Sequence, residues 1–167
     1  KEEVSYMNRT VMVIAAVAII WVVLFIIFMI INNKRKTGEK SFIEENQNKA
    51  LVNLYGKSIR IDNKGLSELE HTAGEYAQKI VALDSGLHTI EGIFQTTDIG
   101  VGKNINLESE KVKFEVHLDA GHKYTVGMYL HSPEENGDGE KAILDIPLTL
   151  YQGSKDARAY IIVYKED

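Results

Sequence analysis

Polar and apolar residues separate sharply in the first part of the chain. From Val11 to Ile31 every residue is Val, Met, Ile, Ala, Trp, Leu or Phe, and none carries a charge. At roughly 1.5 Å of rise per residue, a helix of this length reaches about 30 Å, the hydrocarbon thickness of a bilayer. A helix packed in a globular core would show a polar face over this length, and this one shows none. The pattern predicts a transmembrane helix at 11–31.

A cleaved secretory signal is the alternative for this segment, because it lies near the amino terminus behind Arg9. The apolar region of a signal has about 7 to 15 residues and ends in small residues before the cleavage site. This run is longer and ends in Phe-Met-Ile-Ile-Asn-Asn. We therefore expect a retained single-pass anchor, preceded by a flank at 1–10. Since the sequence begins with Lys1, we expect the start of the chain at Met7 or upstream of the printed residues.

After a polar segment at 32–49, which we expect to be a tether or a short helical stalk, the pattern changes to period two. The alternation is clearest from Lys111 to Leu118, where Val, Phe, Val and Leu face one way and charged residues or His the other. Strands are predicted at Ala50–Tyr55, Lys57–Asp62, Gln78–Leu83, Leu87–Phe94, Lys111–Leu118, His122–His131, Ala142–Tyr151 and Ala159–Tyr164. This series predicts a mainly β domain at 50–167, an antiparallel β-sandwich that is Ig-like or an open barrel.

Turn residues between consecutive strands predict three hairpins. Asp84-Ser85-Gly86 would close the first, Asp119-Ala120-Gly121 the second, and the segment Gln152–Asp156 the third. Pro147 has no N–H for a central ladder, so its strand is expected at an edge or a bulge.

The stretch between Leu66 and Ile80 has apolar residues at helical spacing, interrupted by Gly74. We expect one short helix or an irregular loop there.

Charge and composition exclude several classes of function. The chain has 19 Lys and Arg against 24 Asp and Glu, a net charge of −5, and residues 34–167 alone carry the same net charge. Nucleic-acid binding needs a basic face, and the one basic cluster is Lys34-Arg35-Lys36 beside the apolar run, so no nucleic-acid partner is expected. The sequence has no cysteine, which excludes disulfides, thiol catalysis and a cysteine-linked lipid.

Orientation in the membrane has two opposing indications. Basic flanks prefer the cytoplasmic side, and Lys34, Arg35, Lys36 and Lys40 outnumber Lys1 and Arg9. This count favours a cytoplasmic carboxyl-terminal domain.

The opposing indication is a family resemblance. Ile59-Arg60-Ile61-Asp62, Leu83-Asp84-Ser85-Gly86-Leu87-His88-Thr89-Ile90 and Leu118-Asp119-Ala120-Gly121-His122-Lys123-Tyr124 resemble PEGA-like repeats and small bacterial surface lipoprotein domains. The resemblance covers roughly residues 58–130, and this chain has an apolar segment where the lipoproteins carry a lipid. It implies an extracytoplasmic envelope module that binds or scaffolds, without catalytic residues.

Four motifs are candidates for a chemical role. Asp84-Ser85-Gly86 is also the local signature of aspartic peptidases, which would require a dimer to supply the second carboxylate. His117 and His122 flank one turn, but two histidines do not complete a zinc site. The acidic run Pro133–Glu140 lacks the twelve-position pattern of a calcium loop, and Gly100-Val101-Gly102-Lys103 lacks the spacing of a phosphate loop. We therefore predict no catalytic, cofactor-binding or metal residues.

These observations predict a non-enzymatic binding or scaffold module, held by one helix, with the lipid bilayer and a protein as partners. The alternatives are a membrane-anchored aspartic-type peptidase using Asp84 and an accessory subunit of a membrane complex. The sequence leaves the ligand and the oligomeric state open.

Overall fold

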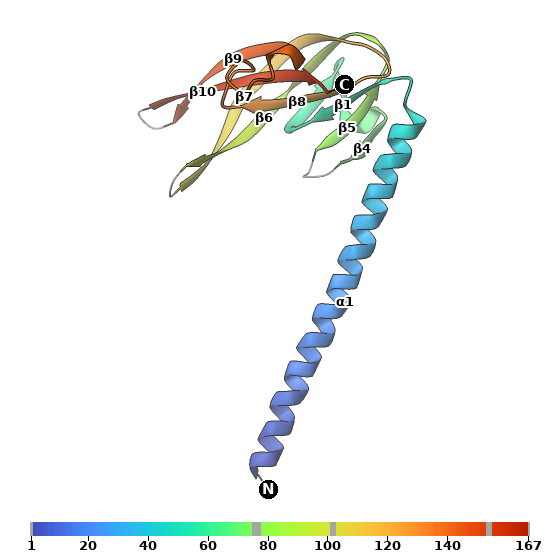
Figure 1. The fold of residues 1–167 in the computed structure, drawn as a ribbon, viewed down its shortest axis with the longest axis vertical. Helices are drawn as coiled ribbons and strands as arrows, with labels where there is room; N and C mark the ends of the chain where they lie inside the picture. Colours follow the sequence, from blue (N-terminus) through green and yellow to red (C-terminus); the bar gives the residue numbers. More distant parts are fainter. Residues whose placement is uncertain (1, 75–77, 101–102, 153–154, 167) are drawn as a thin grey trace. The chain divides into compact units, whose positions relative to one another are not determined.

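The fold is that of a computed structural model, which describes residues 2–74, 78–100, 103–152 and 155–166. Within these residues, one long helix is followed by ten strands in two sheets (Figure 1). The chain divides into two compact units, 1–38 and 39–167. The predicted fold class, an amino-terminal apolar helix followed by a β-sandwich, is confirmed.

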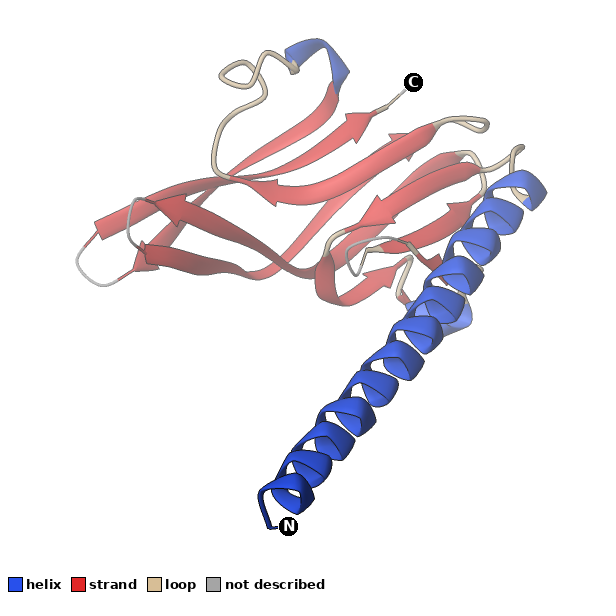
Figure 2. Cartoon of the chain, turned by 60° about the horizontal axis from the view of Figure 1, so that its bottom comes forward, coloured by secondary structure: helices blue, strands red, loops and turns tan. Residues whose placement is uncertain are grey.

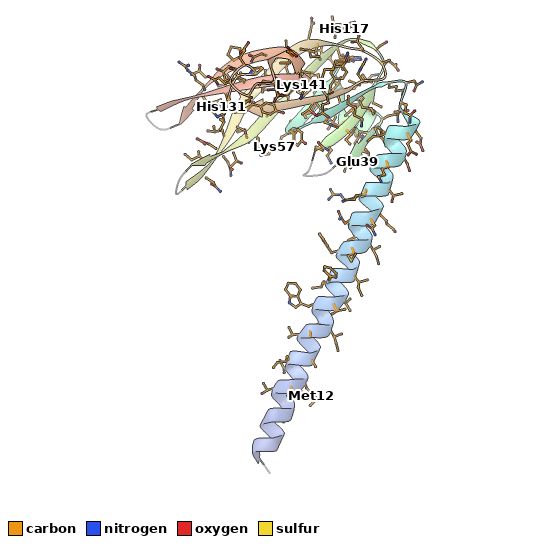
Figure 3. The ribbon with its side chains drawn as sticks, viewed as in Figure 1. Met12, Glu39, Lys57, His117, His131 and Lys141 are labelled. Carbon is orange, nitrogen blue, oxygen red and sulfur yellow. The ribbon has the colours of Figure 1, made fainter. Side chains whose placement is uncertain are left out.

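Helix α1 runs from Glu2 to Glu45. Its apolar segment is exposed on all sides, with Trp21 71% exposed, and Figure 3 shows its side chains radiating around the axis. Within the described residues, this helix is the one long and apolar enough to cross a membrane. It continues into the expected linker at 32–49 and ends where the Asn46 side-chain amide donates to the Phe42 carbonyl at 3.0 Å.

The larger sheet has six strands in the order β4-β5-β1-β8-β10-β9. Their bounds are β1 Ala50–Leu54, β4 His71–Ala73, β5 Lys79–Leu83, β8 Lys123–Tyr129, β9 Ala142–Gln152 and β10 Lys155–Lys165. All neighbours are antiparallel except β1 and β8, which run parallel with Val52 opposite Tyr124.

The smaller sheet has four strands in the order β3-β2-β6-β7. Their bounds are β2 Gly56–Ile61, β3 Lys64–Gly65, β6 Gly86–Gly100 and β7 Lys103–Leu118. The long β6–β7 hairpin dominates this sheet, and Figure 2 shows it beside the hairpin of β9 and β10.

The two sheets enclose one hydrophobic core. Phe94 and Phe114 meet there with ring centroids 6.1 Å apart, and Phe94 is fully buried. The residues predicted to face inward from Lys111–Leu118 are in or against this core. The alternation from Lys111 to Leu118 therefore predicted the inner face of this strand correctly.

Two of the three predicted hairpins are wrong. Asp84 and Ser85 connect β5 to β6, and residues 119–122 connect β7 to β8, yet in both cases the two strands belong to different sheets. Both connections cross the sandwich at the same end, since Gly86 pairs with Leu118. A short turn with glycine fits a crossing as well as a hairpin, because alternation fixes which face is buried and not which strand pairs. Instead of pairing with β5, strand β6 forms a hairpin with β7.

The third predicted hairpin, β9 with β10, is confirmed, and so is the edge position of the strand that contains Pro147. The expected helix or loop between Leu66 and Ile80 is instead a single 3-10 turn, Leu66–Glu68, followed by β4. Residues 75–77 lie outside the described part. The tertiary pairing of β4 with β5 overrides the weak helical spacing.

Candidate functional site

A polar groove lies on the outer face of the six-stranded sheet, the face turned away from the core. On β8, Tyr124, Val126 and Met128 belong to the core, while the alternate residues Thr125, Gly127 and Tyr129 face outward. The outward residues border a groove of about 560 Å³, which we call the outer-face groove. Its polar and aromatic lining residues are Glu39, Asn53, Tyr55, Gln78, Gln95, Thr96, Thr125, Tyr129 and Glu166.

A chain of hydrogen bonds forms the floor of the groove. Asn53 on β1 lies opposite Thr125 on β8 in the parallel register, and its side-chain amide donates to the Thr125 hydroxyl at 3.4 Å. The Thr125 hydroxyl in turn donates to the Glu166 carboxylate. Because Thr125 is only 8% exposed, this chain is held in place by the sheet beneath it.

The wall of the groove comes from the other sheet. Strand β6 has a register shift between Ile93 and Gln95, and a bulge of this kind redirects the side chains that follow it. Gln95 and Thr96 reach the groove from there. Gln95 donates its amide to Glu108, which also accepts a hydrogen bond from Lys57 at 3.1 Å.

Tyr129 closes the groove on the side of β10. Its ring lies over Gly127, where a Cβ atom would come within 3.2 Å of it, and it meets Tyr164 edge to face at a centroid distance of 5.3 Å. Burial, with smaller contributions from Tyr164, Tyr55 and Glu166, raises the pKa of Tyr129 to about 12. Its hydroxyl therefore stays neutral and remains a hydrogen-bond donor at physiological pH.

The groove has an acidic electrostatic character. Glu166 on its floor and Glu39 are the carboxylates among the described residues that line it, and none of these residues is Lys or Arg. An anionic ligand would find no positive partner in the groove.

A second cluster joins two turns of the sandwich to strand β6. His88 on β6 places Nδ1 at 2.7 Å from the Asp62 carboxylate and Nε2 at 2.8 Å from the Asp84 carbonyl oxygen. Asp62 also accepts the Thr89 backbone N–H at 2.9 Å. Because a carbonyl oxygen only accepts, Nε2 carries the proton of its contact. This nitrogen is not positioned to activate a nucleophile, so the geometry fits a structural hydrogen-bond cluster and not an Asp-His catalytic pair. We call it the Asp62–His88 cluster.

The electrostatics of Asp62 agree with that role. Desolvation acts to raise the pKa of this carboxyl, but the hydrogen bonds from Thr89 and His88 and the charges of His88 and Lys64 outweigh it. The net effect holds the pKa of Asp62 below its ordinary value. The family resemblance rests in part on residues 59–62 and 83–90, and these two segments meet at the Asp62–His88 cluster.

Asp84, the candidate peptidase residue, is exposed in the turn between β5 and β6. Its backbone carbonyl accepts the His88 hydrogen bond, and the next glycine, Gly86, has φ +143°. The motif therefore meets the geometric needs of a crossing between sheets.

No group of three or more His, Cys, Asp or Glu among the described residues could hold a metal ion. Nε2 of His117 lies 3.6 Å from Asp119, which also pairs with Lys165 at 3.3 Å. His131 is well separated from His117 on the domain (Figure 3).

In the acidic loop, Ser132 and Glu135 exchange hydrogen bonds and Asp138 pairs with Lys141. The phosphate-loop candidate is the β6–β7 turn, of which Val101 and Gly102 lie outside the described residues.

The sequence reasoning missed the groove. The signal was present in β8: after Lys123, its presumed solvent face reads Thr-Gly-Tyr, whereas the corresponding face of Lys111–Leu118 is Lys, Lys, Glu and His. Small and aromatic residues in place of charges indicate an outer face with a structural or binding role.

No family model matches the chain, and neither a curated protein nor a solved structure shows significant similarity to it.

Proposed function

We propose that this protein is a membrane-anchored, non-enzymatic binding module, in which one helix holds a β-sandwich at a bilayer. The observation that carries the proposal is α1, whose segment from Val11 to Ile31 exposes apolar side chains on every side. Exposure of this extent to water would be strongly unfavourable, whereas a bilayer covers it. The sandwich contributes the binding surface.

The outer-face groove is the candidate for that surface. It is a concave site within the size range of ligand pockets, and it combines a few fixed polar groups with tyrosine rings. Anchoring would keep the groove near ligands and partners of the same membrane, so even a weak interaction would be occupied through the raised effective concentration.

A photo-crosslinking experiment in intact membranes tests this proposal. A photoreactive amino acid replaces Tyr55 at the groove or, as a matched control, Glu115 on the exposed face of β7 in the other sheet. The proposal expects a discrete cross-linked product from position 55 and none from position 115. Products of equal yield from both positions, or none from either, would count against a binding module.

Orientation is addressed by adding protease outside intact cells. The basic residues at 34–36 favour a cytoplasmic sandwich, while the family resemblance favours the outside. Removal of the carboxyl-terminal domain by external protease would support the envelope module, and full protection would support a cytoplasmic adaptor.

A further inference from the structure

The outer-face groove has a chemistry that selects among ligand classes. Its floor is the relay from Asn53 through Thr125 to Glu166, and its sides are the amides of Gln78 and Gln95 and the ring of Tyr129. Two of these polar residues, Thr125 and Gln78, are each 8% exposed. The groups are therefore preorganised by the fold and lose little freedom when a ligand binds.

Three ligand classes fit this lining poorly. A phosphate or carboxylate would be desolvated with no lysine or arginine in the lining and with Glu166 repelling it. An apolar ligand would cover the amides and the carboxylate without satisfying them. A cationic ligand would satisfy Glu39 and Glu166 but would offer nothing to the amide donors of Asn53 and Gln78.

A ligand with many neutral hydroxyls fits it well. Each hydroxyl both donates and accepts, so neighbouring hydroxyls on a ring can donate to Glu166 and the amide oxygens while they accept from the amide N–H groups. The C–H face of such a ring can also lie on an aromatic side chain, and Tyr55, 37% exposed, stands at the groove. The volume of about 560 Å³ suits a short oligosaccharide.

We propose that the outer-face groove binds a neutral saccharide, with Glu166, Thr125 and Asn53 as the polar floor and tyrosine as the stacking surface. The inference rests on the proposed function, because it names the ligand class of the same groove. The expected affinity is weak, in the millimolar to micromolar range, and avidity at the membrane compensates.

The test uses the full chain in phosphatidylcholine nanodiscs, because common glucoside and maltoside detergents carry sugars. Maltotriose, cellotriose and the trimer of N-acetylglucosamine are the probes, followed by saturation-transfer NMR and calorimetry. Glu166→Gln removes the charge of the floor and keeps its shape, and Glu115→Gln makes the same change on the exposed face of β7. Binding of at least one probe is expected, weakened about tenfold by Glu166→Gln and unchanged by Glu115→Gln.

A second variant protects the test against misfolding. Thr125→Val removes the relay hydroxyl, and its amide NMR spectrum shows whether the sandwich remains folded. Failure of every probe to bind, selective binding of choline instead, or binding that both groove variants leave intact would overturn the saccharide assignment. A cross-linked product from position 55 without saccharide binding would leave the binding module standing and remove only this inference.

Discussion

The Asp62–His88 cluster, which also includes the Asp84 carbonyl, predicts how the free energy of unfolding depends on pH in acid. Asp62→Asn removes the charge that accepts the Thr89 N–H and faces His88, and it preserves the volume of the side chain. Position 62 has φ +52°, and asparagine tolerates this left-handed conformation as well as aspartate does. The substitution therefore isolates electrostatics from backbone strain.

The magnitude follows from the two contacts. A hydrogen bond to a charged group contributes about 1.5–3 kcal/mol, but the Asp62 side chain is 44% exposed, and solvent reduces its share. Asp62→Asn keeps both partners in reach, so we expect a loss of about 1 kcal/mol of unfolding free energy at neutral pH.

The pH dependence has a definite sign. The folded-state pKa of Asp62 lies below its ordinary value of 3.8, so the unfolded state binds more protons as the pH falls past that value. The stabilisation is complete above pH 3.8 and is lost as the pH falls through the folded-state pKa. Parent and Asp62→Asn should therefore differ at neutral pH and converge in acid.

Urea unfolding of the full chain in nanodiscs, followed by tyrosine fluorescence, measures both effects. Asp98→Asn, on the exposed part of β6, is the matched control and should unfold like the parent throughout. A difference in unfolding free energy between parent and Asp62→Asn that stays constant from neutral pH into acid would contradict this role of the Asp62–His88 cluster. The absence of any difference at neutral pH would contradict it as well.

Three further predictions follow from particular positions. Gly56→Ala should lower the free energy of unfolding by about 1–3 kcal/mol, because its Cβ would come within 2.8 Å of the Ile93 carbonyl oxygen. Gly65→Ala, whose nearest contact is 3.5 Å, should change it little, and urea midpoints compare the two variants. Phe94→Ala should lower the free energy of unfolding by about 3–5 kcal/mol in the same assay. Leu87→Ala, at a side chain 64% exposed, should lower it by less than about 0.5 kcal/mol, and equal losses would contradict the assigned core. Tyr129 should titrate at about 12 in near-UV absorbance, and Tyr129→Phe should abolish this late titration step. The stabilisation by the neutral Tyr129 hydroxyl is complete below pH 10.0 and is lost as the pH rises to about 12.

How far the sequence predicts the fold depends on the kind of feature. The apolar segment and the strands near Lys111–Leu118 and Ala142–Tyr151 were found because periodicity reports burial directly. Two of the three predicted strand pairings were wrong, because Leu83 and Leu87 look the same in sequence whether the intervening turn closes a hairpin or crosses to the other sheet.

Strand length was underestimated for a related reason. The outer part of β6 from Gln95 to Asp98 has no apolar residue, and in the outer part of β7 the alternation is limited to Ile105 and Leu107. These parts pair through contacts such as Thr97 to Asn106 at 2.9 Å. The candidate site was missed because it unites residues distant in the chain: Asn53, Thr125 and Glu166 come from three separate segments. Only the register of β1 on β8 brings the first two together.

The most direct test of the account is the behaviour of the full-length chain when cell membranes are washed with alkaline carbonate and sedimented. Because the segment from Val11 to Ile31 should lie within the hydrocarbon of the bilayer, we predict that the protein stays in the pellet and is released only by detergent. Recovery of the chain in the carbonate supernatant, without detergent, would contradict the account.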